Sequence, residues 1–118
     1  MLHNYKNSTS LLAKVVDTDL YIQLIQQLNK DFGLIGLTEE FNLNNTPIDL
    51  KNKLQLAVKK LIQTNTVGYY NLLYRIDISE TTLKEINTSD IDKYIEEVTF
   101  LILQRIWKKV YYKNKFSS

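Results

Sequence analysis

The chain contains no cysteine among its 118 residues. Disulfides, thiolate nucleophiles and cysteine-bound metals are therefore excluded, because each of them requires a thiol. Breakers of regular structure are also scarce, since the chain has one proline and three glycines. This scarcity predicts long regular elements rather than a loop-rich fold.

Long apolar runs are missing as well. No stretch approaches the ~20 apolar residues of a membrane-spanning helix, and residues 1–10 lack the apolar run of a signal peptide. We therefore expect a soluble, cytoplasmic protein. The apolar fraction of 44% and the charged fraction of 24% are ordinary for a globular protein. A length of 118 residues is that of one domain, so we expect a single domain over residues 1–118, with residues 1–10 flexible and residues 114–118 frayed.

The groups that usually carry catalysis are sparse. His3 is the only histidine and lies in a polar terminus, whereas a general base needs a fixed position. Gly33 and Gly36 lack the lysine and hydroxyl residues of a phosphate-binding loop. Glu96 and Glu97 point about 100° apart on a helix and cannot converge on one ion. We expect no enzymatic activity, no cofactor and no metal site.

Apolar residues recur at three- and four-residue spacing along much of the chain, which is the period of an amphipathic helix. The sequence therefore predicts an all-α fold, a compact single-domain bundle of four to six helices with a long C-terminal helix. The clearest helices are expected over residues 19–32, 47–63 and 90–113, with a short one that follows Ser79 and ends near residue 87.

Several helix ends have recognisable signals. Thr46, Pro47 and Asp49 form a strong start, because threonine caps, proline suits the first turn and an acid favours the positive end of the dipole. Gly33 suits a left-handed position after the helix that precedes it. Ser89 is expected to cap the last helix.

Residues 67–78 fit either a strand or a helix. A strand would alternate apolar and polar residues, but a lone strand leaves its backbone groups unpaired. No second good strand exists in the chain, so a strand would need residues 11–16 or another protomer as its partner. We therefore favour a helix that ends near Arg75 and is followed by an extended connector.

The same segment holds a candidate ligand pocket made of Tyr70, Tyr74 and Arg75, in which an arginine beside aromatic rings could form a cation–π contact. The simpler alternative buries the rings of Tyr69, Tyr70 and Tyr74 with their hydroxyls at the rim of the core. In that alternative, Arg75 pairs locally with Asp77 or Glu80.

The last helix changes its apolar face partway along. Its second apolar face is a candidate interface, and it consists of Phe100, Leu103, Trp107, Val110 and Tyr111. No acidic residue follows Glu97, so this end of the chain is locally basic. The candidate basic patch consists of Arg105, Lys108, Lys109, Lys113 and Lys115.

Three explanations compete for the change of face. The helix could enter the core of its own domain, or it could dock Trp107 on a second copy or another protein, since tryptophan and tyrosine are enriched at interfaces. Alternatively, the interleaved aromatic and basic residues could bind nucleic acid through stacking and phosphate contacts. An acidic membrane surface is a remaining, weaker candidate.

Residues 72–80 (LLYRIDISE) and 101–105 (LILQR), with the basic-aromatic end, resemble small helical bacterial proteins to which no activity is attached. The resemblance implies an all-helical fold and transfers no catalytic residue or ligand.

The leading hypothesis is a non-catalytic protein-interaction module that self-associates through the second apolar face. One alternative is a nucleic-acid-binding accessory protein that uses the basic-aromatic C-terminal end. The other is a small-ligand pocket near Tyr70, Tyr74 and Arg75.

Overall fold

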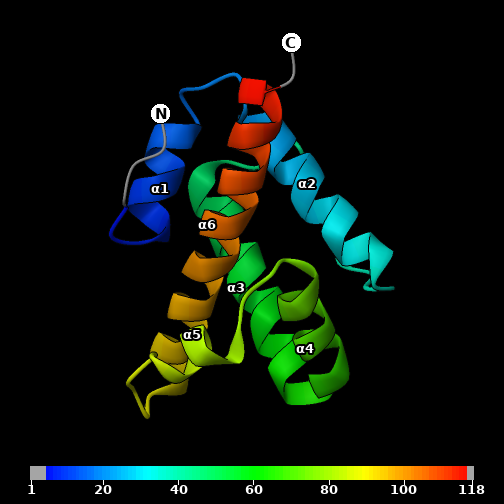
Figure 1. Ribbon diagram of the computed structural model, residues 1–118, viewed down its shortest axis with the longest axis vertical. Coiled ribbons are helices and arrows are strands. Elements are labelled where there is room, and N and C mark those ends of the chain that lie inside the picture. Colours follow the sequence, from blue (N-terminus) through cyan, green and yellow to red (C-terminus); the bar gives the residue numbers. More distant parts are fainter. Residues whose placement is uncertain (1–4, 117–118) are drawn as a thin grey trace.

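The computed structural model describes residues 5–116, which form helices joined by loops and contain no strand. The all-α bundle and its long C-terminal helix are thus confirmed (Figure 1). The helices are α1 (Ser8–Val15), α2 (Tyr21–Leu34), α3 (Pro47–Thr64), α4 (Thr66–Arg75), α5 (Glu80–Lys84) and α6 (Ile91–Phe116).

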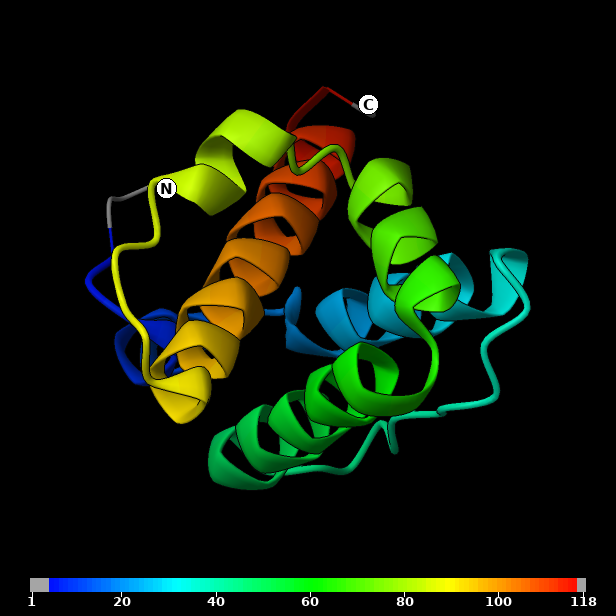
Figure 2. The same ribbon diagram turned by 90° about the horizontal axis from the view of Figure 1, so that it is seen from below.

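Helix α6 is the axis of the molecule. Its 26 residues extend about 39 Å at ~1.5 Å per residue, and the longest dimension of the protein is 40 Å. It packs against α1, α2 and α3, and Figure 1 shows α1 and α2 on either side of its C-terminal half. Helix α4 packs on α2 and α3, as the turned view in Figure 2 shows.

The predicted start of α3 is confirmed. The hydroxyl of Thr46 accepts a hydrogen bond from the amide of Asp49 at 3.3 Å, and Pro47 opens the first turn. A helix start of this kind needs only residues that are adjacent in sequence, which is why the sequence predicts it.

Two other predicted helix ends are wrong by a few residues. Gly33 lies inside α2, and the left-handed position falls to Gly36, whose φ is +80°. The carboxylate of Asp90, not Ser89, caps α6 by accepting hydrogen bonds from the amides of Asp92 and Lys93 at 2.9 and 3.4 Å.

The ambiguous segment forms α4, so the helical alternative is confirmed. Asn65 caps it by accepting a hydrogen bond from the amide of Gly68 at 2.9 Å. A Cβ atom on Gly68 would lie 2.5 Å from the Asn65 side chain, so glycine lets the cap close. After Arg75 the chain turns through Asp77, whose φ of +66° is left-handed.

The two ends of the described chain are more helical than expected. Residues 8–10, within the predicted flexible end, belong to α1, which Asn7 caps through the amide of Ser10. Helix α6 continues beyond residue 113 to Phe116. Residues 1–4, with His3, and residues 117–118 lie outside the described residues.

The second apolar face of α6 is covered by its own chain. Leu103, Trp107 and Val110 are exposed by 0%, 3% and 2% respectively, in the half of the helix that α1 and α2 flank in Figure 1. This accords with the first of the three explanations, entry of the helix into its own core.

Candidate functional site

Charged side chains gather in a groove between the end of α4 and the C-terminal half of α6. Its volume is about 510 Å³. Five basic side chains and one acidic side chain line it, so the lining carries an excess of positive charge. Its lining consists of Arg75, Ile76, Asp77, Arg105, Ile106, Lys108, Lys109, Tyr112 and Lys113. We call this the basic groove.

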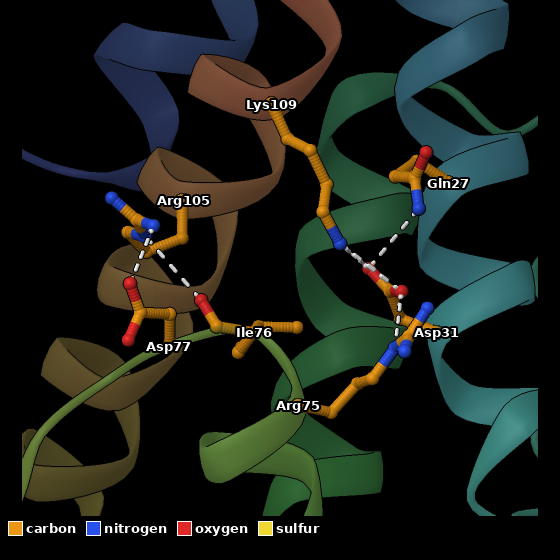
Figure 3. Close-up of polar contacts among 7 residues, drawn as sticks. All are labelled: Gln27, Asp31, Arg75, Ile76, Asp77, Arg105 and Lys109. Carbon is orange, nitrogen blue, oxygen red and sulfur yellow. Dashed lines mark hydrogen bonds and ion pairs between the residues drawn. The ribbon is translucent and has the colours of Figure 1, made fainter.

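Two of these cations are held from beneath by a buried acid on α2. Asp31 has a side chain with 0% exposure. One of its carboxylate oxygens lies 3.1 Å from Arg75 Nε and 3.2 Å from Lys109 Nζ, and the other lies 3.0 Å from Lys109 Nζ. Gln27, one turn earlier on α2, donates a hydrogen bond to the same carboxylate at 3.3 Å. Figure 3 shows these three side chains converging on Asp31 from three helices.

The burial of Asp31 explains why it needs these partners. A buried carboxylate is tolerated only when cations and hydrogen bonds replace its lost water. Lys109 and Arg75 keep 41% and 38% of their side chains exposed. These two cations therefore link the buried acid to the surface of the groove. Their ion pairs with Asp31 hold the positive charges in place.

A second acid, Asp77, holds the next cation along the groove in a different way. Arg105 Nε donates to the carbonyl of Ile76 at 3.3 Å, and Arg105 Nη2 donates to the carboxylate of Asp77 at 3.0 Å (Figure 3). The Asp77 side chain is 87% exposed, so water screens this pair. It orients Arg105 without removing its charge from solvent.

Exposed aromatic rings continue the groove toward the end of α6. Tyr112 lines the groove, and its ring stacks on Phe116 with centroids 5.6 Å apart and planes 5° apart. Their exposures are 37% and 75%. Lys115 lies instead over the ring of Tyr111, with Nζ 5.7 Å from the centroid.

The candidate basic patch is thus brought together in large part. Arg105, Lys108, Lys109 and Lys113 line the basic groove, and Lys115 does not. A helix places residues three and four apart on one face, so the spacing in the sequence predicts this set.

The structure does not bring the three residues of the candidate pocket together. Tyr70 and Tyr74 border a separate hollow of about 370 Å³ beside α5, whereas Arg75 lines the basic groove. Arg75 pairs with Asp31 on α2 and not with Asp77 or Glu80, so the expected local pairing is wrong. A contact between residues 44 apart in sequence carries no local signal.

The simpler alternative, in which the tyrosine rings are buried, holds for one of the three tyrosines. Tyr70 and Tyr74 are 56% and 89% exposed, so neither ring is buried. Tyr69 is buried as that alternative expects, with its hydroxyl 3.1 Å from that of Tyr94. Burial, reinforced by this hydrogen bond, raises the pKa of Tyr69 well above that of an ordinary tyrosine.

The candidate interface is mostly inside the molecule. Leu103, Trp107 and Val110 are buried in the core, and only Phe100 and Tyr111 are partly exposed. The three buried side chains therefore offer no surface to a partner in this structure.

Sequence reasoning missed the most deeply placed charge of the site. Asp31 follows Leu24 and Leu28 by seven and three residues, so it lies on the buried stripe of α2. An acid on an apolar stripe is the signal that could have identified it, because a buried charge requires a partner.

Other kinds of site find no support in the described part of the chain. Over residues 5–116 no three histidine, aspartate or glutamate side chains gather as metal ligands would. None of the helices described is both long and apolar enough to cross a membrane. Comparisons with protein-family models, curated proteins and solved structures found no match.

Proposed function

We propose that this protein is a non-catalytic, nucleic-acid-binding accessory protein, and that the basic groove contacts the phosphate backbone. The observation that supports the proposal is the convergence of five basic side chains and one acid on a single groove. Phosphate contacts by lysine and arginine supply most of the affinity in sequence-independent binding.

The spacing of the cations along α6 suits a polymer of phosphates. Arg105, Lys109 and Lys113 follow one another at four-residue intervals on one side of the helix. Their eight-residue span is about 12 Å at ~1.5 Å per residue. One strand of a duplex carries a charge every ~3.4 Å along its axis, so the row can face about three phosphates.

Enough hydrogen-bond donors remain free for such contacts. Within residues 5–116, Lys108 and Lys113 form no ion pair and are exposed. Lys109 uses its ammonium on the two oxygens of Asp31, and an ammonium has three donors. Arg75 meets Asp31 through Nε, which leaves its terminal nitrogens for a ligand.

Self-association has less support from the geometry. Phe100 and Tyr111 are the accessible part of the second apolar face, and both are only partly exposed. Two such side chains fall far short of the ~800 Å² per partner of a standard interface. The basic groove is therefore the better candidate surface.

The proposal is tested by removing the two unpaired cations. We expect Lys108→Gln/Lys113→Gln to weaken binding of a fluorescein-labelled oligonucleotide by about eightfold per lost phosphate contact at ~50 mM salt. Neither side chain is buried or paired, so the fold should persist. Fluorescence anisotropy measures the affinity, and circular dichroism checks the helix content.

A matched control changes the same charge at the other end of the molecule. Lys84 and Lys93 are exposed on α5 and on the first turn of α6. We expect Lys84→Gln/Lys93→Gln to leave the affinity nearly unchanged. Equal weakening by both pairs, or no binding by the unaltered protein at low salt, contradicts the proposal.

A further inference from the structure

The stacked rings at the end of α6 point to the form of nucleic acid. We infer that the basic groove binds a single strand, with the phosphates along its cations and an unpaired base stacked on the Tyr112–Phe116 pair. This inference rests on the proposed function, and it adds a preference for unpaired bases over a duplex.

The position of the rings is the first observation that supports the inference. Tyr112 itself lines the groove between Lys108 and Lys113 on α6, and Phe116 lies one turn further on. A strand that follows the cations toward the end of the helix therefore reaches both rings. Their planes are nearly parallel, at 5°, so the two rings form a stack that a further flat ring can extend.

The exposure of the rings is the second observation. Phe116 is 75% exposed although one of its faces lies against Tyr112. Its other face is therefore open to a ligand. A nucleobase can cover that face, because every base has a π surface and stacking on aromatic side chains does not depend on base identity.

Base pairing decides which nucleic acid can use this surface. In a duplex the bases are stacked on one another inside the helix, and the protein meets phosphates and groove edges. In a single strand they are available for aromatic rings. Cations alone would bind both forms, so the rings confer the selectivity.

Substitution of the rings tests the stacking contact without changing any charge. We expect Phe116→Ala to weaken binding of labelled oligothymidylate at least about fivefold, with the salt dependence unchanged, because the number of phosphate contacts stays the same. Tyr112→Ala should weaken it similarly, and Tyr112→Phe, which keeps the ring, should not. Phe116 lies at the exposed end of α6, where alanine preserves the helix.

Two further ligands distinguish this inference from the proposed function. The first is an abasic strand with the same number of phosphates, and the second is a duplex of the same length. Weaker binding of both than of oligothymidylate supports stacking. If the abasic strand binds as tightly as oligothymidylate and the ring variants have no effect, stacking is refuted and phosphate binding stands. If no ligand binds at low salt, the proposed function fails as well.

Discussion

The two faces of the C-terminal half of α6 differ in what covers them. One face presents Leu103, Trp107 and Val110 to the core, where each is at most 3% exposed. The other presents Arg105 and Lys109 to the basic groove, with 39% and 41% of their side chains exposed. The two faces share the same few turns of the helix. Residues close together in sequence therefore lie either in the core or in the groove.

Stability and binding can therefore depend on different faces of one helix. Burial of apolar area stabilises the fold roughly in proportion to that area, whereas an exposed cation contributes little to stability and much to the binding of anions. We therefore expect substitutions on the core face to change the free energy of unfolding, and substitutions on the groove face to change affinity.

Trp107 gives the largest expected effect. Trp107→Ala should lower the free energy of unfolding by about 3–5 kcal/mol, because it removes a large buried side chain and leaves a cavity. Denaturant titration measures the change, and Trp107→Phe should lose less because it fills more of the same space. A change near zero would contradict the burial of this ring by its own chain.

The affinity of the same variant for nucleic acid tests whether the two faces are independent. At temperatures where Trp107→Ala remains folded, its affinity for an oligonucleotide should stay close to that of the unaltered protein, because the indole does not line the groove. A loss of affinity in a folded Trp107→Ala variant would show that the two faces are not independent.

Asp31 connects the two faces and should give the next largest effect. It lies fully buried under the groove and holds Arg75 and Lys109. We expect Asp31→Asn to lower the free energy of unfolding by about 2–3 kcal/mol, the cost of losing charge-assisted hydrogen bonds. The larger cost of stranding a buried charge does not apply, because the two cations can reach water.

The same substitution should act in the opposite direction on binding. Removal of the Asp31 charge releases two cations and makes the groove more positive, so affinity for a single strand should rise at low salt and fall more steeply as salt increases. Anisotropy and denaturant titration on one preparation measure both effects. Unchanged stability would show that the buried pairs contribute nothing, and weaker binding would show that the fixed positions of Arg75 and Lys109 matter more than the added positive charge.

The sequence predicted those parts of the structure that depend on near neighbours. The start of α3 at Thr46 and the row of cations from Arg105 to Lys113 both follow from helix period and from end signals. These features involve residues within a few positions of one another, so the pattern alone contains them.

The rest depends on contacts between distant segments. The pair of Asp31 with Lys109 joins residues 78 apart, and the two sides of the basic groove come from different helices. Neither can be located until the packing of α2, α4 and α6 is known. For the same reason the change of face in α6 admitted several explanations, since the sequence does not say which helices cover each half.

Asp77 offers the smallest effect and the closest comparison with Asp31. Asp77→Asn removes the same charge from the same groove, but this side chain is 87% exposed and pairs with one cation, Arg105. Its free energy of unfolding should change by less than about 1 kcal/mol, because water screens an exposed pair. Asparagine also tolerates the left-handed φ of +66° at this position.

The two variants measured together test whether burial or charge governs each property. Both remove one negative charge near the basic groove, so both should raise affinity for a single strand at low salt by a similar factor. Only Asp31→Asn should lose stability, because only that carboxylate is buried. A loss of stability in Asp77→Asn as large as in Asp31→Asn would mean that the exposed pair matters as much as the buried one, and that the division of α6 into a stabilising face and a binding face does not hold.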